Sequence, residues 1–352
     1  MYLTKSLFYF NIYKRLNLKE IAIIILNWNG EKLLEKYLPS VINNTSKDLA
    51  DIIVADNNST DNSIEFLNNN YSEGIKIISL DKNYGFAGGY NRIIEDLDYK
   101  YVVLLNSDVE VSNNWLEPLY KLVSQNKEIA VVQPKICAFK DKTKFEYAGA
   151  AGGYIDIFGF PFCRGRILNS VESDVGQYDD TTEVMWCSGA ALFIKRDVYM
   201  KVGGMDERFF AHMEEIDMCW RISNLGYKLY ETSNSLVWHL GGGTLPMNHP
   251  HKLFLNYRNN LLMLYKNMPF LRRFYIMFIR FFMDLASAFI FLIQGKTNNF
   301  ASVLKAYIAF LKMKKYYKSP SKYVKNKNIY KGSIVLKYFI SAKKFSDLKW
   351  KH

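Results

Sequence analysis

The sequence predicts an α/β fold in which a mostly parallel sheet is flanked by helices and followed by a C-terminal helical region. In the first hundred residues, short apolar runs alternate with amphipathic stretches. The runs are apolar at every position, which is typical of parallel strands buried on both faces. Several of them end in turns rich in Asn and Asp. Alternation of this kind indicates βαβ units, whose helices cover both faces of the sheet.

The elements follow from this pattern in chain order. Strands are expected at 21–26, 52–55, 75–80 and 101–105, and helices at 31–41, 62–69 and 87–96. Ser112 is expected to cap a helix that runs to Val123, with Glu117 near its positive end. Residues 131–183 are rich in short apolar runs and glycine pairs, so we expect an inserted β-rich segment that could hold an acceptor.

The later elements are a buried strand at 183–195, a helix at 214–225 ended by Gly226, and strands at 227–230 and 236–238. Gly241, Gly242 and Gly243 are expected to form a mobile loop. The predicted division is an N-terminal extension (1–19), a catalytic domain (20–250), a helical aromatic region (251–311) and a lysine-rich tail (312–352). Residues 1–19 have no continuous apolar core and no small-residue cleavage site, so they are not expected to be a signal peptide.

Residues 274–293 are long enough to cross a bilayer. Arg280 and Asp284 lie in their middle and cost roughly 2.5–3.5 kcal/mol each on insertion. About a dozen large apolar residues return roughly 0.3–0.6 kcal/mol each, so insertion is near balance or unfavourable. The two charges are also four residues apart and can pair on a helix. The sequence therefore favours a helix that lies at the membrane interface or packs on the domain, with a true span as the alternative. The next helix, 300–311, also has one apolar face.

The net charge of +12 is confined to the tail, where residues 312–352 contain thirteen lysines and one acid, Asp347. Because the tail follows apolar, aromatic helices, anionic lipid is the favoured partner. RNA binding is less favoured, so no nucleic acid is expected, and a solvated, disordered tail is a further alternative. The four cysteines (Cys137, Cys163, Cys187 and Cys219) show no metal or disulfide spacing and predict inert thiols in a reducing cytoplasm.

Four polar turns follow or separate the early strands, and they suggest a nucleotide site, because open α/β sheets bind ligands at the carboxyl ends of their strands. The turns are Asn27–Gly30, Asp56–Asp61, Asn83–Asn91 and Asn106–Asp108. In this order and spacing they resemble family 2 glycosyltransferases of the GT-A fold, in particular the bacterial rhamnosyltransferase-like branch that builds surface polysaccharides. The resemblance covers roughly residues 20–265. Asn106-Ser107-Asp108 is similar to the family's DXD metal motif with its first acid replaced.

The resemblance implies that Asp108 binds Mg²⁺ or Mn²⁺ and through it the donor diphosphate. His239, which precedes the three glycines, matches the family's metal-binding His and is expected to contact metal or diphosphate. An Asp that merely caps a helix and a His that is merely structural are the alternatives.

The acidic run at 213–221 resembles the family's Glu-Asp-x-Asp motif, which makes Glu215 the expected general base. Glu214 and Asp217 belong to the same catalytic group and are expected to raise the pKa of Glu215. The choice between Glu214 and Glu215 stays open. Stabilisation of a helix N-terminus is the plainer alternative for all three.

For the donor, the resemblance implies that Asp56 accepts a hydrogen bond from a pyrimidine base. The glycines of the third turn let the chain pass close to the nucleotide, and some of the polar residues could be turn formers alone. The complete expected donor-binding set is Asn27, Asn29, Asp56, Asn57, Ser59, Asn83, Gly85, Phe86, Asn91 and Asn106.

The implied function is metal-dependent, inverting transfer of a sugar from a nucleoside diphosphate sugar to a hydroxyl of a saccharide acceptor, expected to be lipid-linked, in cell-surface polysaccharide synthesis. The expected location is cytoplasmic, peripheral on the inner face of the cell membrane. A nucleotidyltransferase is one alternative, although the first turn lacks a basic phosphate-gripping loop before Lys32. A non-catalytic sugar-nucleotide binding protein is the other, suggested by Asn106. The sequence does not identify the sugar, the base or the acceptor.

Overall fold

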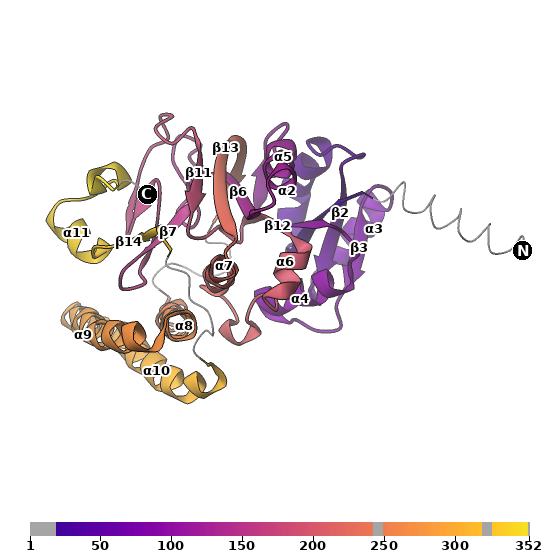
Figure 1. Cartoon of the computed structure of the whole chain (residues 1–352). Helices are drawn as coiled ribbons and strands as arrows, with labels where there is room; N and C mark the ends of the chain where they lie inside the picture. Colours follow the sequence, from indigo (N-terminus) through magenta and orange to yellow (C-terminus); the bar gives the residue numbers. More distant parts are fainter. Residues whose placement is uncertain (1–18, 242–248, 319–325, 351–352) are drawn as a thin grey trace, which may run out of the picture.

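The computed structural model describes residues 19–241, 249–318 and 326–350, and the expected N-terminal extension and most of the glycine loop lie outside these ranges. The described chain forms a nine-stranded mixed sheet with helices on both faces, a second sheet of five strands, and a group of three long helices (Figure 1). The α/β fold and the C-terminal helical region are therefore as predicted.

The four early strands are parallel and in register, as predicted. They are β1 (Ile21–Asn27), β2 (Ala50–Asp56), β3 (Lys76–Ser79) and β4 (Tyr101–Asn106). In β1, successive residues are buried against opposite faces, so that Ala22 and Ile24 belong to one apolar cluster while Ile21 and Ile23 belong to the other. This two-sided burial explains why the runs are apolar at every position.

Beyond these strands the sheet is mixed rather than mostly parallel. Strand β12 (Ala191–Lys195) runs antiparallel to both β4 and β6 (Ile129–Ala138), and β13 (Lys228–His239) is parallel to β6 but antiparallel to β5 (Val109–Val111) and β11 (Thr181–Val184). The reversal occurs because β12 returns from an inserted segment rather than from a crossover helix. The order is β11-β13-β6-β12-β4-β1-β2-β3, with β5 beside β13.

Three further boundaries differ from the predictions. The expected strand at 183–195 is two strands, because residues 185–190 leave the main sheet and Trp186 bridges to Gly153. The expected strands at 227–230 and 236–238 are one strand with a register shift after Thr232. Ser112 caps no helix, because its backbone N–H donates to Leu236 and extends the pairing of β5.

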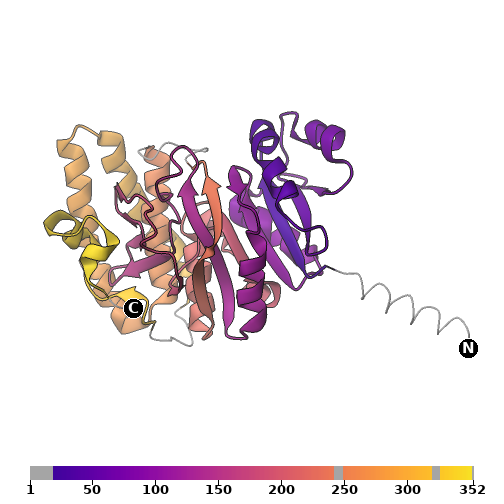
Figure 2. The ribbon, with the colours of Figure 1, turned by 90° about the horizontal axis from the view of Figure 1, so that it is seen from above.

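The helices divide between the two faces of the sheet (Figure 2). Helices α2 (Glu31–Asn43), α3 (Ser63–Tyr71) and α5 (Leu116–Gln125) contribute to one apolar cluster. Helices α4 (Gly85–Asp96), α6 (Arg196–Lys201) and α7 (Glu214–Asn224) contribute to the other. Each helix therefore buries its apolar face on the sheet, and α4 and α7 begin on the side of the sheet where the polar turns lie.

The inserted segment forms the second sheet and receives a strand from the tail. Strands β7 (Gly153–Asp156), β8 (Pro161–Cys163), β9 (Arg166–Ile167) and β10 (Ser170–Val171) are antiparallel, and β14 (Ile329–Tyr330) pairs in parallel with β7. The alternative of a solvated, disordered tail is wrong for residues 326–350. Helices α11 (Ile334–Ile340) and η3 (Phe345–Leu348) continue the tail, whose aromatic rings pack against the insert.

Helices α8 (Pro250–Asn267), α9 (Phe270–Ile293) and α10 (Thr297–Met313) pack together beside α7, and the short η2 (Lys314–Tyr316) follows them. By length and composition α9 could cross a membrane. One face of α9 is nevertheless fixed to the protein: the Arg280 guanidinium pairs with Asp284 at 3.3 Å and donates to the Phe158 carbonyl at 2.8 Å and to Asn260 Oδ1 at 2.6 Å.

Replacing Phe345 with Ala is expected to destabilise the protein by about 3–5 kcal/mol, because it removes a buried ring from the interface between tail and insert. Urea unfolding of the purified protein measures the change. Phe339, in the same tail but 73% exposed, is the matched control, and its Ala variant should lie within about 0.5 kcal/mol of the wild type. Equal stability of both variants would contradict the packing of the tail.

Candidate active site

The ends of β1 and β2 bring Asn27, Asp56 and Ser59 into contact. Asn27 and Asp56 are register partners, and Asn27 Nδ2 donates to Asp56 Oδ1 at 3.0 Å. The Ser59 backbone N–H donates to Asp56 Oδ2 at 2.9 Å and its hydroxyl donates to Oδ1. Asp56 is 2% exposed, so these bonds hold its carboxylate in one orientation at the edge of the sheet.

The neighbouring turns are cross-linked by their own amide side chains. Asn29 Oδ1 accepts from the Thr60 backbone N–H at 2.7 Å, and Asn57 Nδ2 donates to Asn83 Oδ1 at 3.0 Å and to the Gly85 carbonyl at 3.1 Å. The polar atoms of Asn29, Asn57 and Asn83 thus shape the turns; of these residues, only Asn57 is among the expected turn formers, together with Ser59 and Asp61. Gly85 has φ +70°, a conformation that favours glycine.

Asn91 is expected to bind donor, but the structure gives it a different environment. Its Oδ1 accepts from the Tyr199 hydroxyl at 2.6 Å and from the Met205 backbone N–H at 3.0 Å, while Nδ2 donates to the Met205 carbonyl at 2.8 Å. Its amide is therefore saturated by the chain, and we reassign Asn91 to a structural role.

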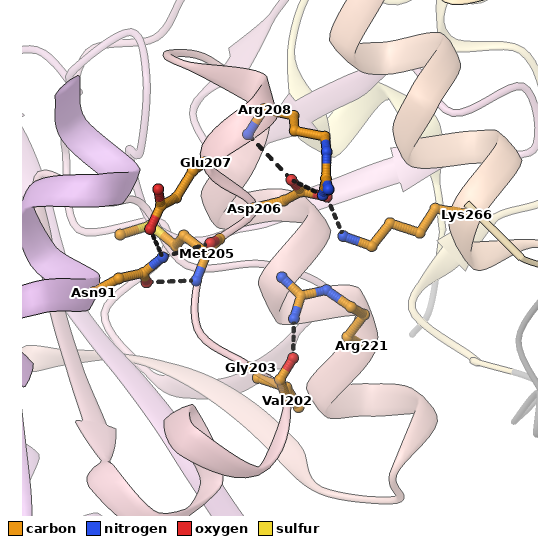
Figure 3. Close-up of a pocket in the computed structure, with 9 residues that line it drawn as sticks. All are labelled: Asn91, Val202, Gly203, Met205, Asp206, Glu207, Arg208, Arg221 and Lys266. Carbon is orange, nitrogen blue, oxygen red and sulfur yellow. Dashed lines mark hydrogen bonds and ion pairs between the residues drawn. The ribbon is translucent and has the colours of Figure 1, made fainter. Parts of the chain in front are cut away.

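Asn91 also lines a hollow of about 530 Å³ (Figure 3). The charged side chains in this hollow satisfy one another and the backbone. Arg221 donates to the carbonyls of Val202 and Gly204, at 2.5 and 2.8 Å, and Lys266 pairs with Asp206 at 2.9 Å. Within the described ranges, the charged side chains of this hollow are thus already paired, so the candidate site is assigned to the strand ends instead.

Asp108 and His239 meet at the β4–β5 turn. His239 pairs with Val109 because β13 runs antiparallel to β5, and its Nε2 lies 3.1 Å from Asp108 Oδ1. Glu146 Oε1 lies 3.5 Å from the other ring nitrogen, Nδ1. Burial alone would lower the pKa of His239, but the two carboxylates outweigh it and raise the pKa to about 10.

This pair fits a divalent cation in its donor chemistry once the cation replaces the proton that the carboxylates favour on His239, because the neutral imidazole is the metal ligand. A carboxylate oxygen and an imidazole nitrogen suit Mn²⁺ or Mg²⁺, and Glu146 is placed to orient the ring from the far side. Nowhere in the described ranges do three or more His, Cys, Asp or Glu residues form a metal-binding group. Two protein ligands match an ion that takes its remaining ligands from diphosphate and water. Sequence reasoning missed Glu146, which lies in the insert and carries no motif.

Glu214 and Glu215 begin α7. Glu214 is buried and Glu215 half-buried, and an oxygen of each (Oε2) has no hydrogen-bond partner in the described chain. Desolvation raises the pKa of Glu215 to about 6. The pKa of Glu214 is also raised, first by burial and then by the charges of Glu215 and Asp217. Gly189 lies close to both Glu215 and Phe86, because a Cβ added to it would be 3.8 Å from Glu215 Cβ and 3.1 Å from the Phe86 ring. Glu215 is therefore near the turn at Asn83–Asn91.

Asp217, expected in the catalytic group, is structural instead. It is fully buried, and its Oδ2 pairs with Arg221 at 2.8 Å and Lys266 at 2.9 Å. Burial would raise its pKa, but the two cations lower it. Desolvation, and neither Glu214 nor Asp217, raises the pKa of Glu215, so the prediction that these two acids do so is wrong; Asp217 raises the pKa of Glu214 instead.

The segment before α7 is strained and is held by Asn259, a residue that sequence reasoning missed. Phe210, His212 and Met213 all have positive φ, between 67° and 73°. Asn259 Nδ2 lies 2.8–2.9 Å from the carbonyls of Phe209, Ala211 and His212. Helix α8 therefore fixes where α7 starts. A buried Asn within a helical pattern was the only signal in the sequence.

The fold is of the GT-A type. Residues 22–203 match the model of glycosyl transferase family 2, which is more than half of the chain, and the chain belongs to that family. It is therefore a glycosyltransferase.

Relatives share this assignment at modest identity. The N-acetylglucosaminyl-diphospho-decaprenol L-rhamnosyltransferase of Mycobacterium tuberculosis is 23% identical over 64% of this chain and 77% of its own. Rhamnosyltransferase WbbL of Escherichia coli K12 is 26% identical over 60% of this chain and 79% of its own. These relatives place the chain beside rhamnosyltransferases and thus agree with the branch that the motifs resemble.

Solved structures show the same fold. GalNAc-T7 with UDP, GalNAc and Mn²⁺ aligns with a TM-score of 0.54 at 18% identity, over 70% of this chain and 48% of its own, so the chain spans about half of that protein. A mannosyltransferase of Pyrobaculum calidifontis in complex with GDP-Man and Mn²⁺ aligns with a TM-score of 0.51 at 11% identity, over 88% and 83%. At these identities the likeness concerns the fold alone.

Glu215→Gln is expected to lower the transfer rate by about 10²–10⁴-fold with donor affinity little changed, because a positioned base contributes about that much. Steady-state kinetics with a sugar donor and a saccharide acceptor measure the rate. Since the base must be ionised, the wild-type rate should rise as pH increases through about 6. Glu214→Gln is the matched control; if it is the more damaged variant, Glu214 is the base.

Proposed function

We propose that this glycosyltransferase uses a divalent cation to transfer a sugar from a nucleoside diphosphate donor, with inversion, to a hydroxyl of a lipid-linked saccharide in surface-polysaccharide synthesis. The observation that carries the proposal is the contact of Asp108 with His239 at the strand ends, beside the Asp56 turn. One relative, an N-acetylglucosaminyl-diphospho-decaprenol L-rhamnosyltransferase, supports this acceptor class.

In this proposal Asp108 Oδ1 and His239 Nε2 would hold the cation, and Glu146 would orient the imidazole. When bound, the cation would supply positive charge to offset that of the leaving diphosphate. Asp56, held by Asn27 and Ser59, accepts a hydrogen bond from the base of the nucleotide. The glycines near Phe86 allow the nucleotide to approach the backbone, and Asn106 lies beside it at the end of β4.

Glu215 takes the proton of the acceptor hydroxyl. Its desolvated carboxylate has a raised pKa, which strengthens it as a base while leaving it ionised near neutral pH. The hydroxyl oxygen then attacks the anomeric carbon from the face opposite the diphosphate, and one displacement inverts the configuration.

We further propose that α9 lies flat on the inner face of the cell membrane, in contact with anionic lipids. Its outward face forms a continuous stripe at helical spacing, while Arg280 and Asp284 tie the inward face to the protein. The stripe contains Phe270, Phe274, Phe278, Phe282, Phe289 and Ile293, each at least 49% exposed. Exposed lysines of α10 and its end, Lys305, Lys312 and Lys315, can attract anionic headgroups.

Metal dependence is tested with Asp108→Asn and His239→Ala. Titration calorimetry with UDP, dTDP and GDP should show binding that strengthens with Mn²⁺ in the wild type, and both variants should lose most of this strengthening and the transfer activity. Binding without metal should change little. Wild-type turnover by Asp108→Asn with excess Mn²⁺ would refute the metal assignment.

Membrane docking is tested with the double variant Phe274→Glu/Phe278→Glu. Co-sedimentation with liposomes containing phosphatidylglycerol should fall at least tenfold, because two aromatic contacts with the bilayer are lost. Val175→Glu, which changes an equally exposed residue of the insert, is the matched control and should bind as the wild type does. Undiminished binding of the double variant would contradict this surface.

A further inference from the structure

Arg166 lies on a hairpin that presents two arginines to opposite sides. Strands β8 and β9 pair Cys163 with Arg166, so these two side chains share one face of the second sheet. Arg164, between them, lies on the other face. Its guanidinium makes two bonds to Asp180, at 2.8 and 3.0 Å, and lies 3.5 Å from the buried Glu231.

Arg166 is equally buried but has no such carboxylate. It is 6% exposed, and its two hydrogen bonds are long: Nη1 donates to the Leu168 carbonyl and Nη2 to the Cys163 sulfur, each at 3.5 Å. Its Nε has no hydrogen-bond partner, and no acid lies within ion-pair distance, among the described residues. The remaining stretches of the sequence contain no Asp or Glu that could supply one. Burial alone would lower the pKa of Arg166, but Cys163, Tyr147 and the more distant Glu146 raise it, so its charge is stabilised without a directly paired carboxylate. A buried cation that lacks such a partner is costly, so a reason for keeping it is expected.

The surroundings of Arg166 join the two halves of the candidate active site. Its guanidinium stacks on the ring of Tyr147, 4.7 Å from the centroid, and Tyr147 follows Glu146, which faces His239. On its other side Cys163 is within electrostatic reach of both Glu146 and Glu215: burial raises the pKa of its thiol, Arg166 lowers it, and the two carboxylates raise it further. Arg166 therefore lies between the proposed metal ligands and the proposed base.

We propose that Arg166 is an anion-binding residue of the active site and that its ligand is a substrate diphosphate. The stacked Tyr147 covers one face of the guanidinium, and Nε, which has no partner among the described residues, is left to donate to a phosphate oxygen. Two substrates of the proposed function carry this group, the nucleoside diphosphate of the donor and the prenyl diphosphate of a lipid-linked acceptor. The inference rests on that proposed function.

The test measures diphosphate binding by full-length Arg166→Met and Arg166→Lys. Calorimetry compares two probes: UDP or dTDP with Mn²⁺, and farnesyl diphosphate without nucleotide. Both variants should bind one probe about 10–100-fold more weakly, as expected when bonds to a charged group are lost, with Lys less affected than Met. Weakening of the nucleotide identifies the donor as the source, and weakening of farnesyl diphosphate identifies the acceptor. Unchanged binding of both probes overturns the proposal.

Thermal unfolding gives an independent readout, with Arg164→Met as the matched control on the same hairpin. Removing Arg164 leaves Asp180 and the buried Glu231 without their cation, so this variant should melt several degrees lower. Removing Arg166 leaves no directly paired carboxylate behind, only the more distant Glu146, so Arg166→Met should melt close to the wild-type temperature. A fall as large as that of Arg164→Met would mean that Arg166 is structural. If the wild type shows no Mn²⁺-dependent nucleotide binding, the proposed function itself fails, which is a different result.

Discussion

The site depends on the register of the parallel strands. Asn27 lies opposite Asp56, and Leu26 lies opposite Asn106, so three polar turns meet at one edge of the sheet. A shift of one residue would turn every side chain to the other face and bury the polar ends. The same constraint acts at longer range in β13, whose pairing with β5 brings His239 to Asp108 across 131 positions of sequence.

Helices α8 and α9 connect the proposed active site to the proposed membrane surface. Asn259 of α8 holds the strained segment before α7, and its neighbour Asn260 accepts a hydrogen bond from Arg280 of α9. The proposed base and the proposed membrane-facing stripe are thus joined through two adjacent residues. A glycosyltransferase that takes its acceptor from a lipid gains from this arrangement, because the base stands at a fixed position relative to the bilayer.

The sequence was sufficient for the local features. Apolar runs and Asx-rich turns identified β1, β2 and β4 within one or two residues, and the ordered motifs identified the family. The sequence did not predict the role of residues whose environment depends on tertiary contacts. The ion pairs of Asp217 and the saturated amide of Asn91 depend on Lys266 and Met205, which are distant in sequence. Neither Glu146 nor Arg166 lies in a motif, since their positions follow from the fold of the insert. The aromatic residues of the tail were visible in the sequence, but their packing against the insert, as for Tyr330 and Trp350, could not be predicted from it.

The central claim is that Asp108 and His239 form one metal site at the edge of the sheet. Anomalous diffraction from crystals grown with Mn²⁺ and a bound nucleoside diphosphate tests it most directly. The account predicts a single strong manganese peak in direct contact with Asp108 Oδ1, His239 Nε2 and diphosphate oxygens. A manganese ion bound to the diphosphate but contacting neither side chain, or bound elsewhere, would contradict it.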